Sequence, residues 1–221
     1  MDYTIANVNE ARAGISVEII CNENKEEIKT LLFKPSFWKE ENLTKGDIID
    51  EIRFDSLKKT ADVCCAVARA ESLLASSDYS RRRLINRLLH YGHDQTSCEN
   101  AADYMIEHKY INEPEQTLRI TRFYCMRKHW GKKRIAAELM GRGYERKYIF
   151  EALDSLTPEE YHGSLVALIA EKYPAPPENR HENDLRIAAL SRMGYSVDEI
   201  LRGMEEASYA YADMEEAISD D

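Results

Sequence analysis

Three glycines, Gly92, Gly143 and Gly194, recur at a fixed interval of 51 residues along the chain. A leucine lies four residues before each glycine, and a cysteine or an isoleucine lies six residues after it. The same pattern therefore occurs three times in the 221 residues. Self-similarity at such a period is typical of helical repeat proteins, in which each unit packs only on its neighbours. We expect a mainly α-helical protein that offers a long surface to a polymer or an assembly.

Helix start and stop signals predict three helices in each unit. In the first unit, Ser80 is expected to cap a helix over residues 81–91, which Gly92 ends in the left-handed conformation. In the second unit, helices are predicted over residues 115–129 and 132–142. Capping boxes, in which a Ser or Thr and a Glu three residues later satisfy each other's backbone amides, mark further helix starts. They are expected at Thr96–Glu99, Thr157–Glu160 and Ser196–Glu199.

The N-terminal residues have a different pattern from the rest of the chain. Ile15, Val17 and Ile19 alternate with polar residues, which is typical of a strand, and residues 29–33 offer a return strand. An isolated hairpin is marginally stable, so we expect it to pack on a helix. The predicted fold is an elongated, curved array of three tandem three-helix repeats with a small strand-containing N-terminal extension. The expected boundaries are 1–55 for the extension, which holds the hairpin and a linker, 56–110, 111–156 and 157–206 for the repeats, and 207–221 for an acidic tail.

Charge is distributed unevenly along the chain, whose net charge is −10. Residues 119–147 hold ten lysines and arginines against two carboxylates, a net charge of +8, whereas residues 157–221 have a net charge of −10. Such asymmetry should steer binding and fix the polarity of the chain on a partner. The alternative is that both segments are only solvated helix faces. An acidic third repeat would either contact a basic partner surface or hold nucleic acid away, so that it contacts protein only.

Several classes of protein are disfavoured by the composition. No apolar run approaches ~18 residues, so no membrane span is expected, and the N-terminus lacks the basic and apolar regions of a secretory signal. Five cysteines without a CxxC pair, three of them (Cys64, Cys98 and Cys125) among apolar neighbours, indicate core residues in a reducing cytoplasm. His90, His93 and Cys98 match no standard metal site. Neither a Ser–His–Asp order nor a Gly-rich phosphate loop is present, so we expect no enzyme, cofactor or metal.

Basic side chains gather at two predicted helix starts. Lys132, Lys133 and Arg134 occupy a first turn, where the helix dipole favours an anion and the crowded cations repel one another. An anion would therefore stabilise this turn, which favours a binding role. Three arginines hold the matching place in the first repeat, whereas the third repeat has Glu182 and Asp184 there.

Aromatic residues lie beside this basic segment. Trp130 and Tyr124 offer π faces on which nucleobases could stack, although packing under the glycine turn is the commoner role for such a tryptophan. The residues predicted to contact nucleic acid or a nucleoprotein filament are Arg81, Arg82, Arg83, Arg122, Arg127, Lys128, Trp130, Lys132, Lys133 and Arg134. Phosphate contacts of this kind would give binding a salt dependence rather than a sequence preference.

Three segments resemble successive repeats of the RecX family. Residues 80–92, which read Ser-Arg-Arg-Arg-Leu-Ile-Asn-Arg-Leu-Leu-His-Tyr-Gly, are similar to the first repeat of that family. The central motif is similar to residues 128–143, which read Lys-His-Trp-Gly-Lys-Lys-Arg-Ile-Ala-Ala-Glu-Leu-Met-Gly-Arg-Gly. The third repeat is similar to residues 192–200, which read Arg-Met-Gly-Tyr-Ser-Val-Asp-Glu-Ile. Asn112 and Glu113 stand where the family usually has two aspartates, which is a mild departure.

This resemblance, over about residues 43–206, implies a non-enzymatic regulator of RecA in DNA repair, recombination and the SOS response. RecX-like proteins bind the groove of the RecA–single-stranded DNA filament and inhibit its recombinase, ATPase and co-protease activities. The partners implied are RecA and this filament, and weak direct binding to DNA is also compatible with the resemblance. We expect a cytoplasmic monomer. Two alternatives stay open. One is a DNA-binding helical module that acts without RecA, because three-helix units resemble helix-turn-helix domains. The other is a helical-repeat scaffold for an unrelated protein.

Overall fold

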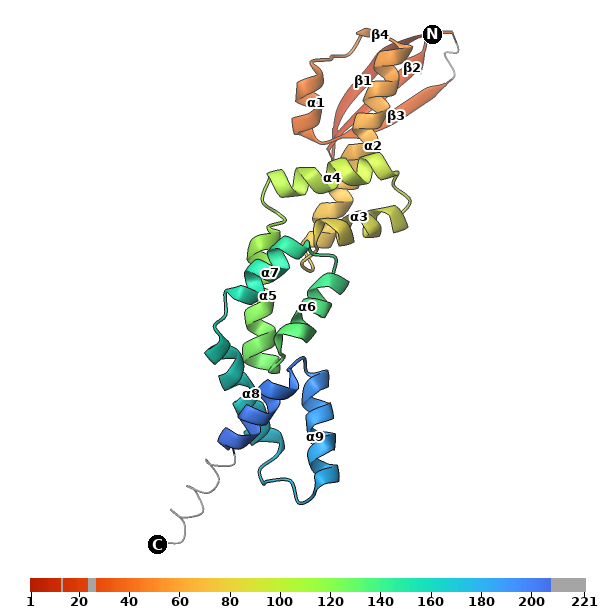
Figure 1. Ribbon diagram of the computed structural model, residues 1–221. Coiled ribbons are helices and arrows are strands. Elements are labelled where there is room, and N and C mark those ends of the chain that lie inside the picture. Colours follow the sequence, from red (N-terminus) through yellow and green to blue (C-terminus); the bar gives the residue numbers. More distant parts are fainter. Residues whose placement is uncertain (13, 24–26, 208–221) are drawn as a thin grey trace. The chain divides into compact units, whose positions relative to one another are not determined.

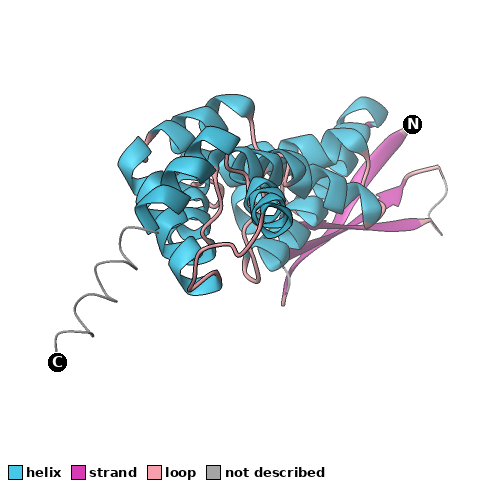
Figure 2. Ribbon diagram, turned by 60° about the horizontal axis from the view of Figure 1, so that its bottom comes forward, coloured by secondary structure: helices cyan, strands magenta, loops and turns pink. Residues whose placement is uncertain are grey.

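The structure is a computed structural model that describes residues 1–12, 14–23 and 27–207 (Figure 1). The chain folds as two compact units, one over Met1–Ile111 and one from Asn112 onward. The first unit combines a small sheet with helices, and the second is helical throughout its regular elements in the described range (Figure 2). A mainly helical chain with strands at the N-terminus agrees with the predicted fold class. Most of the predicted acidic tail, residues 208–221, lies outside the described residues.

A four-stranded antiparallel sheet forms from the N-terminal residues. Its strands, in the order β3-β2-β1-β4, are β1 (Asp2–Ala11), β2 (Gly14–Cys21), β3 (Ile28–Phe33) and β4 (Ile48–Asp50). The two predicted strands correspond to β2 and β3, which pair with Val17 opposite Leu31. Strands β1 and β4 were not predicted from the sequence. The register of β1 shifts between Ile5 and Asn7, which interrupts the alternation of apolar and polar residues, and β4 has only 3 residues.

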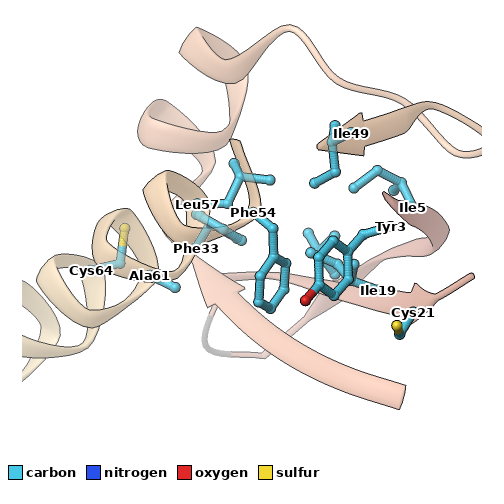
Figure 3. Packing of buried hydrophobic residues seen from close by; sticks show 11 residues of the cluster. Tyr3, Ile5, Ile19, Cys21, Phe33, Ile49, Phe54, Leu57, Ala61 and Cys64 are labelled. Atoms are coloured by element: carbon cyan, nitrogen blue, oxygen red, sulfur yellow. The ribbon is translucent and has the colours of Figure 1, made fainter. Parts of the chain in front are cut away.

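A single helix, α2 (Glu51–Leu74), covers the buried face of the sheet and continues beyond it. The ring of Tyr3 stacks on that of Phe54 with 4.2 Å between centroids, and Leu57 and Phe33 are fully buried in the same cluster (Figure 3). Further along α2, Ala70 belongs to a second core, which α3 and α4 complete. The sheet core and the core of α3 and α4 therefore share one helix, and the boundary predicted at residue 55 lies within it.

The first unit is completed by α1 (Pro35–Glu41), α3 (Arg81–His90) and α4 (Gln95–Glu107). Ser80 caps α3 as predicted, because its side chain accepts a hydrogen bond from the backbone N–H of Arg83 at 3.2 Å. The cap of α4 is Asp94, so the capping box predicted at Thr96–Glu99 is wrong. Asp94 accepts from the N–H of Ser97 at 3.0 Å, and hydrogen bonds from Ser97 lower the pKa of this carboxyl. A carboxylate at the positive end of a helix is a strong cap, which explains the earlier start.

Within the described residues, the second unit is built from five helices, α5 to α9, and a further helical segment at residues 197–207. The helices are α5 (Glu113–Lys128), α6 (Lys132–Gly141), α7 (Arg146–Asp154), α8 (Pro158–Lys172) and α9 (Arg180–Arg192). Two predicted capping boxes are confirmed, at Thr157 for α8 and at Ser196 for residues 197–207. The repeat glycines Gly92, Gly143 and Gly194 have φ angles of 90°, 81° and 100°, so all three have the left-handed conformation that was predicted for Gly92.

Three cysteines predicted to be core residues are buried, each in a different hydrophobic cluster. Cys64 lies in the sheet core, Cys98 in the core of α2, α3 and α4, and Cys125 in the core of α5, α6 and α7. Burial raises the pKa of these three thiols, so they remain protonated and unreactive. All five cysteines of the chain are free thiols.

Candidate nucleic-acid interface

The exposed side of α5 carries arginines and large apolar side chains together. Arg119, Arg122, Phe123, Met126 and Arg127 are spaced by three and four residues, so they share one side of the helix, which we call the α5 face. The exposed fractions of Phe123 and Met126 are 50% and 44%. Arg122 and Arg127 were predicted from the sequence as contact residues, whereas Phe123 and Met126 were not. Their helical spacing from the arginines is the signal that could have found them.

Cations near the C-terminal end of α5 have no carboxylate partner in the part of the chain that the structure describes. Among the described residues, none forms an ion pair with Arg122, Arg127 or Lys128, and all three side chains are exposed. An unpaired guanidinium keeps its N–H donors for a ligand, and its fork of donors matches the oxygens of a phosphate. The α5 face can therefore offer hydrogen-bond donors to phosphates next to an apolar contact.

The N-terminus of α6 is occupied by the end of another helix. The Gly131 N–H donates to the carbonyl of Met193 at 2.8 Å, and the Lys133 N–H donates to that of Gly194 at 3.3 Å. These carbonyls follow the C-terminus of α9, whose dipole is negative, so they take the place of the expected anion. The approach is close, because a Cβ added to Gly194 would lie 2.6 Å from the backbone nitrogen of Arg134. These two amides are therefore not available to an external anion, contrary to the prediction for this turn.

The three basic side chains in the first turn of α6 have different surroundings. Arg134 Nη1 donates to a carbonyl at the end of α9 at 3.4 Å, and its guanidinium carbon lies 4.0 Å from the ring centroid of Trp130. Lys132 Nζ lies 3.9 Å from the Asp154 carboxylate. Lys133 is exposed and forms no ion pair with a described residue. Two of the three predicted contact residues are thus engaged within their own unit.

Trp130 packs inside the second unit. Its ring stacks on that of Tyr124 with 4.3 Å between centroids and 9° between planes. Because two groups about 4 Å above one ring cannot share a face, Tyr124 and the Arg134 guanidinium cover opposite faces of the indole. Arg142 donates to the Tyr124 hydroxyl, and burial raises the pKa of Tyr124. This arrangement agrees with the packing interpretation, since neither face of Trp130 is open to a nucleobase.

In the first unit, the three arginines at the start of α3 diverge. Arg81 Nε donates to the Asp103 carboxylate at 2.8 Å and thereby ties α3 to α4. Arg82 is exposed. The guanidinium carbon of Arg83 lies 5.2 Å from the ring centroid of Tyr79. The structure therefore gives Arg81 a structural contact and leaves Arg82 and Arg83 at the surface.

A further group of arginines and tyrosines, missed by the sequence analysis, lies along α2 and α3. Arg69 of α2 and Arg87 of α3 both lie over the ring of Tyr91, with their guanidinium carbons 4.7 and 5.2 Å from its centroid. We call Arg69, Tyr79, Arg83, Arg87 and Tyr91 the arginine–tyrosine cluster. The spacing of four residues from Arg83 to Arg87 to Tyr91 is a signal that could have found part of it. Arg69 comes from another helix, so its place could be found only in three dimensions.

A hollow of about 960 Å³ beside α1, α2 and α4 has the opposite electrostatic character. Seven carboxylates and two lysines line it, so it should repel phosphates. In the described part of the chain, no group of three or more His, Cys, Asp or Glu residues could hold a metal ion. No helix in that part combines the length and the apolar character needed to cross a bilayer. The basic surfaces on α3 and α5 are thus the candidate sites for an anionic partner.

The chain is similar to a known protein in sequence and to solved structures in fold. No protein-family model matches the chain. A stretch of 135 residues is 26% identical to the regulatory protein RecX of Chromohalobacter salexigens, covering 61% of this chain and 88% of that protein. The crystal structure of a regulatory protein RecX has a similar fold, with a TM-score of 0.70 and 15% identity over 89% of this chain and 96% of that chain. The crystal structure of RecX from Lactobacillus salivarius has a TM-score of 0.59 and 19% identity over 66% of this chain and 96% of that chain.

Proposed function

We propose that this chain regulates RecA by binding the RecA–single-stranded DNA filament. Its similarity to RecX proteins in sequence and in fold supports this function. The observation that carries the proposal is the α5 face, where arginines lie beside exposed apolar side chains. A nucleoprotein filament presents phosphates and protein side by side, so its binder needs both kinds of contact. Arg122 and Arg127 supply donors for phosphates, and Phe123 and Met126 supply the apolar contact with protein.

Binding of this kind inhibits the recombinase, ATPase and co-protease activities of RecA, because a protein seated in the filament groove obstructs filament extension and access to the DNA. The protein acts without catalysis, as a cytoplasmic monomer. Three tandem repeats of three helices provide the surface, namely α2–α4, α5–α7, and α8 and α9 with residues 197–207. In each repeat a positive-φ glycine follows the middle helix, which supports a common origin for the three repeats.

The predicted contact residues divide into two groups in this proposal. The exposed cations contact the filament, and these are Arg82, Arg83, Arg122, Arg127, Lys128 and Lys133. The remaining candidates position the helices that carry them, through the contacts of Arg81 with Asp103 and of Arg134 with Trp130. Reversing the charges of Lys132, Lys133 and Arg134 would therefore confuse a loss of binding with a loss of structure. The α5 face is a cleaner place for the test.

ATP hydrolysis by RecA on single-stranded DNA, measured with increasing amounts of the full chain, tests the proposal. We expect the wild-type protein to inhibit hydrolysis. An Arg122→Glu/Arg127→Glu variant should need at least about tenfold more protein for the same inhibition, because two phosphate contacts become repulsive. The matched control is Arg12→Glu/Lys45→Glu, which makes the same change in net charge at two exposed turn residues. The control should inhibit as the wild type does.

Other outcomes identify which part of the proposal fails. Equal inhibition by the α5 variant and the wild type would keep the regulatory function and exclude the α5 face as the contact. Equal loss in the variant and the control would indicate an effect of net charge alone. No inhibition by the wild type at any ratio to RecA would exclude the function. Tight binding to bare DNA would then favour a DNA-binding helical module, and its absence would favour a protein-interaction scaffold.

A further inference from the structure

Residues 208–221, which we call the C-terminal segment, are complementary to the α5 face in composition. They hold five carboxylates and neither lysine nor arginine. Tyr209, Tyr211, Met214 and Ile218 lie among these carboxylates, so the segment combines negative charge with aromatic and apolar side chains. The α5 face combines exposed arginines with exposed apolar side chains. The two therefore match in charge and in apolar character.

The end of the described chain is held close to α5 through α8. Glu206 Oε2 lies 2.5 Å from His162 Nε2 of α8. Two residues further along α8, the Ser164 hydroxyl donates to the Cys125 carbonyl of α5 at 2.6 Å. Cys125 lies in sequence between the arginines of the α5 face, so Ala207 is held within a few side-chain lengths of the helix that carries this face.

The C-terminal segment is long enough for its carboxylates to reach the α5 face. Glu216 is nine residues beyond Ala207, and an extended chain spans about 3.3 Å per residue, or roughly 30 Å in all. An α-helix with its side chains is about 10–12 Å across. A chain of this length can therefore pass around α5 to its exposed side.

We propose that the C-terminal segment docks on the α5 face of its own chain and competes there with the phosphates of a polyanionic partner. Among the described residues, none forms an ion pair with Arg122, Arg127 or Lys128, so these cations are available to the carboxylates of the segment. A tethered segment has an effective concentration of about millimolar, so ion pairs that are individually weak are sufficient for occupancy.

Such a contact makes the α5 face self-regulated. A partner with many phosphates displaces the segment, because it offers more charges and releases counterions when it binds. A ligand with few anionic groups competes poorly with the tethered carboxylates, so the segment would favour long polyanions over short ones. This regulatory consequence rests on the proposed function, whereas the contact itself requires no RecA.

Methyl NMR of the full chain, with carbon-13 at the methionine methyl groups, tests the contact in the absence of RecA. Asp213→Asn/Glu215→Gln/Glu216→Gln keeps the length of the segment and removes three of its charges. This variant should shift the signal of Met126 on the α5 face and leave that of the buried Met105 unchanged. High salt should move the wild-type Met126 signal toward its position in the variant, because salt screens exposed ion pairs.

The matched control is Glu171→Gln/Glu178→Gln/Asp184→Asn, which removes the same charge from exposed residues of the same unit outside the segment. It should leave the Met126 signal at its wild-type position. In the RecA ATPase assay, the segment variant should inhibit at about threefold to tenfold lower concentration than the wild type. This is the gain expected when a segment that covers the site in about 70–90% of the molecules is released. The control should inhibit as the wild type does.

Three results would overturn the contact. One is a Met126 signal at the same position in the wild type and the segment variant at low salt. Another is an equal shift in the segment variant and the control, which would indicate an effect of net charge alone. The third is a shift that grows with protein concentration, which would assign the contact to the segment of another copy.

The contact and the proposed function can fail separately. A Met126 signal that shifts as expected, in a protein that does not inhibit RecA, would retain the contact and exclude the regulatory function. Inhibition of RecA by a wild-type protein whose Met126 signal does not respond to the segment variant would retain the function and exclude the contact.

Discussion

The N-termini of α3 and α6 lie 51 residues apart, and each begins with three basic residues, but the two helix starts are stabilised in different ways. At α3, the Ser80 side chain caps the helix. At α6, the matching position is Gly131, which has no side chain, and carbonyls at the end of α9 bind the free amides instead. The same sequence pattern therefore leaves arginines available at one helix start and builds a helix junction at the other. The repeated sequence therefore does not give the same contacts, because α3 is capped by the adjacent Ser80, whereas the amides at the start of α6 bind carbonyls from elsewhere in the chain.

The largest expected effect is at the repeat glycines, where Gly92 and Gly194 have similar φ angles but different surroundings. A Cβ at Gly92 meets nothing within 4 Å, whereas a Cβ at Gly194 would lie 2.8 Å from the Gly131 carbonyl oxygen. Gly92→Ala should cost about 1–2 kcal/mol for the left-handed backbone alone. Gly194→Ala should lower the free energy of unfolding by a further ~1–3 kcal/mol, because it overpacks the α6–α9 junction. Urea unfolding of the two variants measures the difference, and equal losses would show that the junction is not tight.

A smaller effect is expected from the side-chain cap of α3. Ser80→Ala removes the acceptor for the Arg83 amide and should lower the free energy of unfolding by about 1 kcal/mol. Ser80→Thr, which keeps a hydroxyl, should recover most of this loss, as measured by the urea midpoint. If the alanine variant is as stable as the wild type, α3 does not depend on this cap, and the contrast with α6 would fail.

The smallest effect concerns acid stability and Lys133. Burial raises the pKa of Glu199, but hydrogen bonds from Ser196 and the charges of Lys133 and Arg202 outweigh it, so the net pKa is lowered. The stability that comes from this lowered pKa is present above the unfolded pKa, near 4.5, and is lost as the pH falls through the folded pKa. Lys133→Gln should raise the pKa of Glu199 and reduce this acid-dependent loss by ~0.2–1 kcal/mol, as expected for an exposed charge pair.

Arg82 is the matched control for Lys133, since it lies 51 residues earlier and has no ion pair with a described carboxylate. Arg82→Gln should leave the acid dependence of the urea midpoint unchanged. An NMR titration of the Glu199 carboxyl reports the shift directly in the Lys133→Gln protein. Equal acid dependence in the wild type and both variants would mean that Lys133 has no more influence on a carboxylate than Arg82 has.

Local signals in the sequence were sufficient for most helices of the fold. The starts of α3, α6 and α8 were predicted correctly. At α3 and α8 the reason is local, because the Ser80 and Thr157 side chains accept hydrogen bonds from amides within one turn. The start of α4 was misplaced by two residues, since two acceptors compete there and the carboxylate is preferred. Strand β1 was missed because its bulge breaks the alternation that identifies a strand.

The candidate site was predictable in its charges but not in its contacts. Arg122 and Arg127 are exposed on α5, where the sequence placed a basic surface. The pairing of Arg69 with Tyr91 joins two helices, and the hydrogen bond from Gly131 to Met193 joins residues far apart in the chain. Neither contact produces a periodic pattern of residues by which it could be predicted from the sequence. The division of the cations into contact residues and structural residues therefore required the structure.

Because α2 is continuous through two hydrophobic cores, it determines how the first unit unfolds. Phe54 and Leu57 near its start are buried in the sheet core, and Ala66 and Ala70 near its end are buried in the core of α3 and α4. The amides between these two groups are protected by both cores, so exchange of their protons with solvent requires both to open. Residues 51–74 should thus contain the most slowly exchanging amides of the first unit, and the sheet and the adjacent helices should unfold as a single cooperative element.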